Sequence, residues 1–247
     1  MFQIAWITLR RITEKSLLVQ LGVLAAVLVY LALGLDSVIL NEAAGSEQSG
    51  IFVVFLFLSV FTIFWTTIAI PREIGRKEVH VYLSKPITRL HYLLGKFLGM
   101  AGMAIVAEAL LLAIFTACLM IKGQPVTAWF FFAAGRTALF LVLLSAICTM
   151  VSVLIAEVPA MVAVLAIAAA GSVVFALPVL TWASFQPTAA AGMMSAYWLL
   201  PNLLHYRWEP SPPGFGSYLG NLLLYTTGWC ALSLALAYVI LRRRDLP

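Results

Sequence analysis

Residues 97–121, FLGMAGMAIVAEALLLAIFTACLMI, decide the environment in which this chain folds. Glu108 is the only charged side chain in this run. About 20 consecutive apolar residues in a helix are enough to cross a hydrocarbon core roughly 30 Å thick. The stretch therefore predicts a transmembrane helix.

Similar apolar runs recur on both sides of this stretch. The 247 residues are 63% hydrophobic and 10% charged, whereas soluble domains are about 45–50% apolar and about 25% charged. We therefore predict an all-α integral membrane protein that forms a single transmembrane domain over residues 1–247. Six spans are expected, at residues 16–35, 51–70, 97–121, 128–155, 159–182 and 218–241.

The positive charges predict the orientation of these spans. Twelve of the 15 Lys and Arg residues lie before the first span, between the second and third, or after the sixth. Lys and Arg accumulate on the cytoplasmic side of membrane proteins. Both termini are therefore expected in the cytoplasm. Because the charges flank spans, the net charge of +5 does not predict a nucleic-acid partner.

The residues before the first span suit an amphipathic helix that lies in the membrane interface. Ala5, Trp6 and Leu9 fall near one helical face, while Arg10 and Arg11 fall elsewhere. The pattern is compatible with membrane anchoring or with a lateral contact to a partner protein.

The motifs of several enzyme classes are absent from the sequence. It contains no GxxxxGK[ST] phosphate loop, no HExxH and no GxSxG. Cys118, Cys148 and Cys230 form no CxxC pair and fall inside predicted spans. We therefore expect no catalytic residue, metal site or cofactor in this chain.

The segment between the second and third spans mixes charges of both signs with apolar residues. It reads PREIGRKEVHVYLSKPITRLHYLLGKFLG over residues 71–99. The proline at position 86 predicts a short helix, a turn at residues 84–86, and a second helix that continues into the third span. Thr88 is expected to cap this second helix.

This segment resembles the cytoplasmic signature of ABC-2 type permeases, the membrane subunits of ATP-driven exporters. The matching positions are Glu73, Gly75, Leu83, Pro86, Arg89, Gly95 and Lys96. The sequences LRRRDL at 241–246 and LLPN at 199–202 are also similar to elements of the family. One departure is Arg76, where many members have a small hydroxyl residue.

The resemblance implies a fold, partners and a location. The fold would be that of an ABC-2 exporter permease, with an N-terminal interfacial helix and a cytoplasmic coupling helix. The chain would work as a homodimer of permeases with two copies of a separate ATPase subunit, which would bind ATP and Mg. The expected location is the bacterial cell (inner) membrane.

The resemblance also implies that residues 72–83 form a coupling helix that docks on the ATPase. Charged residues would make directional contacts there, while apolar residues would fill a cleft. Without the resemblance, the simpler interpretation is a solvated loop that sets topology. The docking residues would be Glu73, Ile74, Gly75, Arg76, Lys77, Glu78, Val79 and Tyr82.

Two charged residues lie inside predicted spans. A lone charge at the membrane centre costs a few kcal/mol on insertion scales, so Glu108 should face protein or water, or be protonated. Arg136 on the fourth span is its candidate partner. The pair would either lock two helices together or line a substrate path.

The segment between the fifth and sixth spans is apolar enough to dip into the outer leaflet. We expect outer re-entrant or gate helices there, with Tyr197, Trp198, Pro201 and Asn202 as gate residues. The alternative is an interfacial lid that only shields helix ends.

The function predicted from sequence is a permease subunit that couples ATP hydrolysis by a partner to substrate export. Two alternatives remain. One is an ion-coupled secondary carrier that uses Glu108, and the other is a nontransporting membrane scaffold driven by an ATPase partner. No polar constellation in the spans identifies a substrate class.

Overall fold

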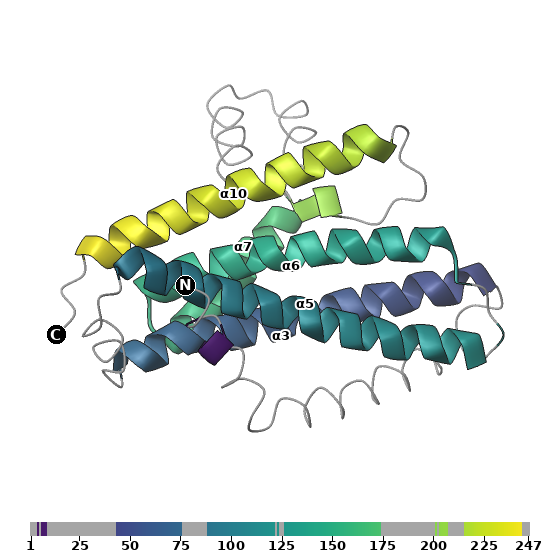
Figure 1. The fold of residues 1–247 in the computed structure, drawn as a ribbon, viewed down its shortest axis with the longest axis horizontal. Coiled ribbons are helices and arrows are strands. Elements are labelled where there is room, and N and C mark those ends of the chain that lie inside the picture. The colour runs from purple at the N-terminus through teal and green to yellow at the C-terminus, as the bar shows by residue number, and fades with distance from the viewer. Residues whose placement is uncertain are drawn as a thin grey trace, which may run out of the picture.

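The computed structural model describes residues 4, 6–8, 43–75, 88–121, 123, 126–173, 201, 203–206 and 215–243. These residues form helices and short connections, with no strand among them. The longest helices lie along the long axis of the molecule (Figure 1). The elements are α3 (Ala43–Gly75), α5 (Arg89–Ile121), α6 (Ala128–Leu154), α7 (Glu157–Val173), the 3-10 turn η1 (Leu203–Tyr206) and α10 (Phe215–Arg243).

Helix α6 lies at the centre of this bundle. It contacts α3, α5, α7, α10 and η1. Of its most apolar 18-residue stretch, 72% is buried within the chain, against 22% for α10. The hydroxyls of Ser145 and Thr149 are fully buried and donate to carbonyls of α6 itself, Leu141 O and Ser145 O, both at 2.7 Å. These bonds let an apolar helix carry polar residues in its core.

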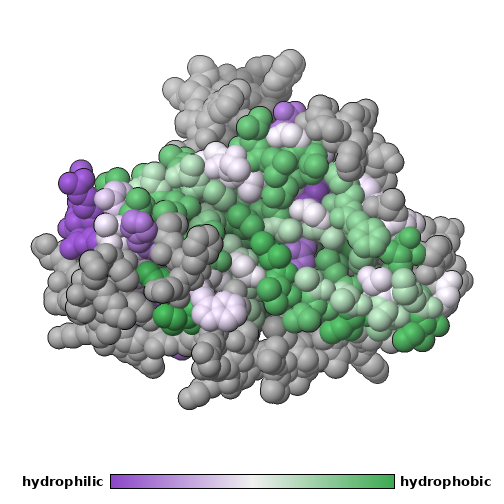
Figure 2. Space-filling view, viewed as in Figure 1, coloured by the Kyte–Doolittle hydropathy of each residue, from purple (hydrophilic) through white to green (hydrophobic). Residues whose placement is uncertain are grey.

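The outer surfaces of the other helices are apolar. Figure 2 shows one face that is hydrophobic across its middle, with hydrophilic residues gathered at the end where α10 finishes. On α3, Phe52, Leu56, Val60 and Phe64 repeat every four residues and are each about half or more exposed. Four of the described helices are long and apolar enough to cross a membrane. The surface is therefore suited to lipid rather than to water.

Most of the predicted spans have a helical counterpart. The second, third, fourth and sixth spans correspond to α3, α5, α6 and α10, and the fifth corresponds to α7. Helix α7 has 17 residues, so its described length is roughly 26 Å. The first span, 16–35, and residues 174–182 of the fifth lie outside the described residues. The count of six spans stays a prediction.

Two predicted boundaries need correction. Helix α3 begins at Ala43, eight residues before the predicted start, and it continues past the predicted end at residue 70 as far as Gly75. Pro71 lies inside it, and transmembrane helices tolerate an internal proline because neighbouring groups satisfy the freed carbonyl. Arg72 therefore does not begin a separate short helix.

Near the N-terminus, residues 6–8 are helical, with Trp6 66% exposed and Thr8 buried.

Candidate functional site

One end of the bundle collects the basic side chains. There α3 ends, α5 begins, α6 ends, α7 begins and α10 ends. Residues 76–87, which connect α3 to α5 at this end, lie outside the described residues. We refer to this region as the basic end; its described basic residues are Arg72, Arg89, Lys96, Arg242 and Arg243.

A buried ion pair joins α3 to α5 at the basic end. The Lys96 amine lies 2.5 Å from Glu73 Oε1, and the Tyr92 hydroxyl donates to Glu73 Oε2 at 2.8 Å. The side chains of Lys96 and Glu73 are 3% and 8% exposed. Burying either charge alone is costly, so each depends on the other. The last turn of α3 and the second turn of α5 are therefore fixed to each other.

This placement differs from the docking role expected for Glu73. Its carboxylate already accepts two bonds inside the protein, so it is not presented to a partner as an exposed charge. Ile74 is half-buried and packs against the apolar cluster that contains Ile70, Tyr92 and Leu93, whereas Gly75 is exposed. The other expected docking residues, Arg76, Lys77, Glu78, Val79 and Tyr82, lie outside the described residues.

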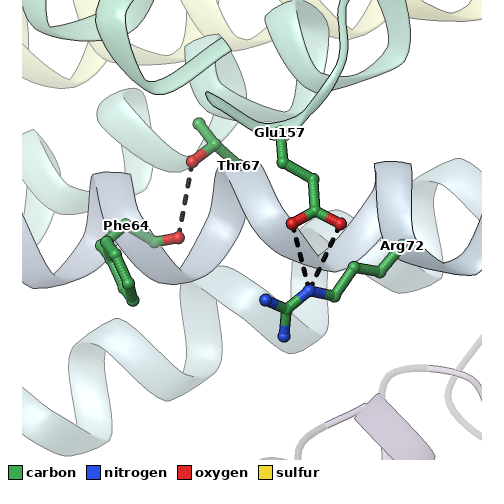
Figure 3. Close-up of polar contacts among 4 residues, drawn as sticks. All are labelled: Phe64, Thr67, Arg72 and Glu157. Atoms are coloured by element: carbon green, nitrogen blue, oxygen red, sulfur yellow. Dashed lines mark hydrogen bonds and ion pairs between the residues drawn. The ribbon is translucent and has the colours of Figure 1, made fainter. Parts of the chain in front are cut away.

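A second ion pair joins α3 to α7. Arg72 Nε lies 3.3 and 3.2 Å from the two carboxylate oxygens of Glu157, and Figure 3 shows these groups facing each other between the helices. Glu157 is the first residue of α7, where a negative charge also interacts favourably with the helix dipole. The Arg72 and Glu157 side chains are 55% and 34% exposed, so the pair adds orientation more than stability.

A third contact joins the start of α5 to the end of α10. Arg89 Nη1 donates to the carbonyl oxygens of Leu241 at 2.9 Å and Arg242 at 3.0 Å. The last carbonyls of a helix have no partner within that helix, so the guanidinium satisfies two of them. Thr88 Oγ1 accepts from the backbone N–H of His91 at 3.3 Å. The predicted N-cap of this helix is therefore confirmed.

The sequence predicts these contacts only in part. Arg89 and Lys96 are positions of the family signature and of the positive charge that sets topology, and Tyr92 carries no predicted role. The sequence does contain a pattern that points to the buried Glu73–Lys96 pair. Lys96 lies next to a predicted span, and it follows Tyr92 by four residues, so both side chains lie on the same helical face. The acceptors of Arg89 leave no such signal, because they are backbone carbonyls.

Glu108 and Arg136 are both buried in the middle of the bundle but do not pair. They are 3% and 2% exposed, and among the described contacts no hydrogen bond or ion pair joins them. The Arg136 guanidinium lies over the rings of Trp129 and Phe132, at 5.2 and 5.0 Å from the ring centroids. Helical side chains lean toward the N-terminus, so on antiparallel α5 and α6 the two lean in opposite directions. Glu108 Oε1 has no hydrogen-bond partner among the described residues.

The segment before α10 enters the bundle far from the basic end. Pro201 and Leu203 are buried, and a Cβ added to Gly171 of α7 would lie 2.5 Å from Pro201 O and 2.9 Å from Leu203 Cγ. The Tyr206 hydroxyl lies 2.5 Å from Thr226 Oγ1 of α10.

The Tyr206 ring also packs on Phe140, near the middle of α6, with the ring centroids 5.5 Å apart. The other expected gate residues, Tyr197, Trp198 and Asn202, lie outside the described residues. Only Pro201 of the expected gate is therefore placed, and it packs against α7.

No metal site is evident in the described part of the chain, where no three His, Cys, Asp or Glu side chains are grouped to hold an ion.

The family model of the ABC-2 family transporter proteins matches residues 16–246. No curated protein matches the chain. The match covers nearly the whole sequence and includes every helix described above except the short N-terminal turn. The chain therefore belongs to the ABC-2 family of transporter membrane proteins.

Proposed function

We propose that this chain is the permease subunit of an ATP-driven ABC exporter and that residues 76–87 receive the force from a separate ATPase. The observation that carries the proposal is the set of cross-helix contacts at the basic end. The three contacts flank residues 76–87: Arg72 and Glu73 precede the segment, and Arg89, Tyr92 and Lys96 follow it.

Because of these contacts, a displacement of residues 76–87 would also move the helices. The Glu73–Lys96 pair holds α3 and α5 together immediately beside the segment, so both helices follow when it moves. Arg72 extends the connection to α7, and Arg89 extends it to α10. Rigid helices joined by discrete polar contacts are the kind of network that carries coupling over tens of ångströms.

We propose different roles for the residues that the sequence predicts to dock on the ATPase. Glu73 and Ile74 act as positioning residues, since they face the protein interior. Direct docking on the ATPase falls to Arg76, Lys77, Glu78, Val79 and Tyr82. Charged residues with one aromatic suit a directional contact around an apolar anchor.

The assembly would contain two permease copies and two ATPase copies that bind ATP and Mg. The basic end would face the cytoplasm, as the distribution of Lys and Arg predicts, and the bacterial inner membrane is the proposed location. The apolar outer faces of the helices would contact lipid or the second permease copy. Closure of the ATPases on ATP would move the basic ends of both permeases and open a path between them.

Capture of an ABC ATPase tests the docking step. The tagged chain is coexpressed with a candidate ABC ATPase subunit from the same genome and purified in mild detergent. We expect Tyr82→Ala to reduce the captured ATPase at least tenfold, because it removes the aromatic anchor. Phe64→Ala, which removes an aromatic ring from the exposed face of α3, should capture ATPase like the wild type. Equal capture by Tyr82→Ala and the wild type would contradict docking through this segment.

An ion-coupled secondary carrier is the second candidate, because Glu108 is buried and its Oε1 has no hydrogen-bond partner among the described residues. Such a carrier would function without any ATPase. Reconstituting the purified chain alone distinguishes the two: a proton or sodium flux that Glu108→Gln abolishes would favour the carrier.

A further inference from the structure

Helix α10 connects the basic end to the turn η1, and each connection includes a hydrogen bond from a single side chain, which at the basic end adds to the apolar packing of Ala237 and Leu241 on α5. At the basic end, Arg89 donates to the Leu241 and Arg242 carbonyls. Toward the other end, Tyr206 of η1 shares a hydrogen bond with Thr226. Thr226 and Leu241 are 15 residues apart in a helix of 29 residues, which places the two contacts about 22 Å apart.

The helix between these contacts is built to move as one piece. It contains no proline, and it is a single α-helix from Phe215 to Arg243. Its buried face is one continuous seam of mostly small residues, which lets it lie close against α6 without large interlocking side chains. The seam consists of Leu222, Thr226, Cys230, Ser233, Ala237 and Leu241.

Arg89 holds α10 by its backbone. Because its acceptors are main-chain carbonyls, the contact fixes the position of the helix end and not merely one side chain. Tyr206 is also held from two sides, since its ring packs on Phe140 while its hydroxyl contacts Thr226. A displacement of α5 at Arg89 would therefore reach η1 through α10.

We infer that Arg89 is a positioning residue that transmits the movement of the ATPase-docking segment through α10 to η1. The inference rests on the proposed function and extends it, because it identifies the helix that carries the movement and the turn that receives it. Tyr206 is the receiving residue. Neither residue contacts substrate or nucleotide in this scheme.

Hydrogen exchange in the complex of this chain with its ABC ATPase tests the inference without knowledge of the substrate. Exchange of the backbone amides of residues 203–206 is compared with ADP and with ATP plus vanadate. In the wild type we expect exchange there to rise about tenfold in the ATP–vanadate state, within the usual range of coupling between sites. In Arg89→Gln and in Tyr206→Phe the ATP-dependent rise should disappear, while ATPase capture stays at the wild-type level.

Arg243→Gln is the matched control, because it removes the same charge from the exposed end of α10. It should keep the full ATP-dependent rise. Arg89→Lys keeps the charge but not the planar fork of donors, so we expect a reduced rise; this variant supplies the test if Arg89→Gln does not fold. The double variant Arg89→Gln/Tyr206→Phe should behave like either single variant, because both interrupt one path.

The outcomes separate the inference from the proposed function. A full rise in Arg89→Gln, or an equal loss in Arg243→Gln, would overturn the role of Arg89. A wild-type complex that captures ATPase but shows no ATP-dependent change at residues 203–206 would overturn the inference alone. Failure of the wild type to capture ATPase would instead contradict the proposed function.

Discussion

The basic end and the middle of the bundle use polar side chains in opposite ways. At the basic end they join one helix to another, as in the Glu73–Lys96 and Arg72–Glu157 pairs. In the middle, most of the described hydroxyls bond to carbonyls of their own helix. Figure 3 shows both kinds, with Thr67 contacting Phe64 O within α3 beside the ion pair between α3 and α7.

This difference indicates which part of the molecule moves as a block. Bonds within a helix satisfy buried polar groups but do not resist sliding of that helix against its neighbours. Bonds between helices resist such sliding directly. The basic end is therefore expected to move as one unit, while the helices beyond it can shift against each other.

Breaking the buried pair should give the largest effect. Lys96→Met leaves the Glu73 carboxylate buried without its charge partner, and loss of one member of a buried pair typically costs about 3–5 kcal/mol. We expect the free energy of unfolding in mixed micelles to fall by that amount. The double variant Glu73→Leu/Lys96→Met should recover most of the loss, because neither charge of the pair remains.

Ser145→Ala provides the comparison from the middle of the bundle. It removes a bond that lies within α6, so the loss should be about 1 kcal/mol or less. If Ser145→Ala costs as much as Lys96→Met, the proposed contrast between the two regions is wrong.

The packing of the 201–203 segment on α7 should give an intermediate effect. In Gly171→Ala the new methyl group would meet Pro201 O and the Leu203 side chain, and overpacking of this kind costs about 1–3 kcal/mol. Thermal unfolding of the purified chain measures the loss. Gly228→Ala on α10 is the control, because nothing lies within 4 Å of its added Cβ; it should leave stability unchanged or slightly higher. If the two variants melt at similar temperatures, the Pro201 and Leu203 groups shift to fit the new methyl group without a loss of stability.

The exposed ion pair should give the smallest effect. Arg72→Gln removes its contact with Glu157, and exposed pairs are typically worth about 0–1 kcal/mol. The difference between variant and wild type should shrink further as salt rises, because solvent-exposed charges are screened. Unfolding measured at low and high sodium chloride checks this, and a loss that stays constant with salt would indicate a role other than electrostatics.

The sequence predicted the helices well because each leaves a long apolar run. The fourth span was placed within one residue of the end of α6, and the cap at Thr88 was confirmed because its signal is local.

The contacts between helices were less predictable, for physical reasons. Glu108 and Arg136 have opposite charges and similar predicted depths in the membrane, so the sequence suggested a pair. Side chains on antiparallel helices lean in opposite directions, however, and this lean separates the two. Glu73 looked like an exposed docking charge, because its partner Lys96 lies 23 residues away on another helix. The close approach of Pro201 to Gly171 depends on backbone packing between elements 30 residues apart, and side-chain types do not encode it locally.

The carbonyl acceptors of Arg89 have a consequence for how the protein is made. Leu241 follows Arg89 by 152 residues, so during synthesis the arginine emerges long before the helix end that it will hold. The Glu73–Lys96 pair spans only 23 residues and can form as soon as α5 has left the ribosome. The basic end is thus completed in stages, and α10 is the last described helix to join it. A nascent chain stalled before α10 would carry an arginine without these two acceptors.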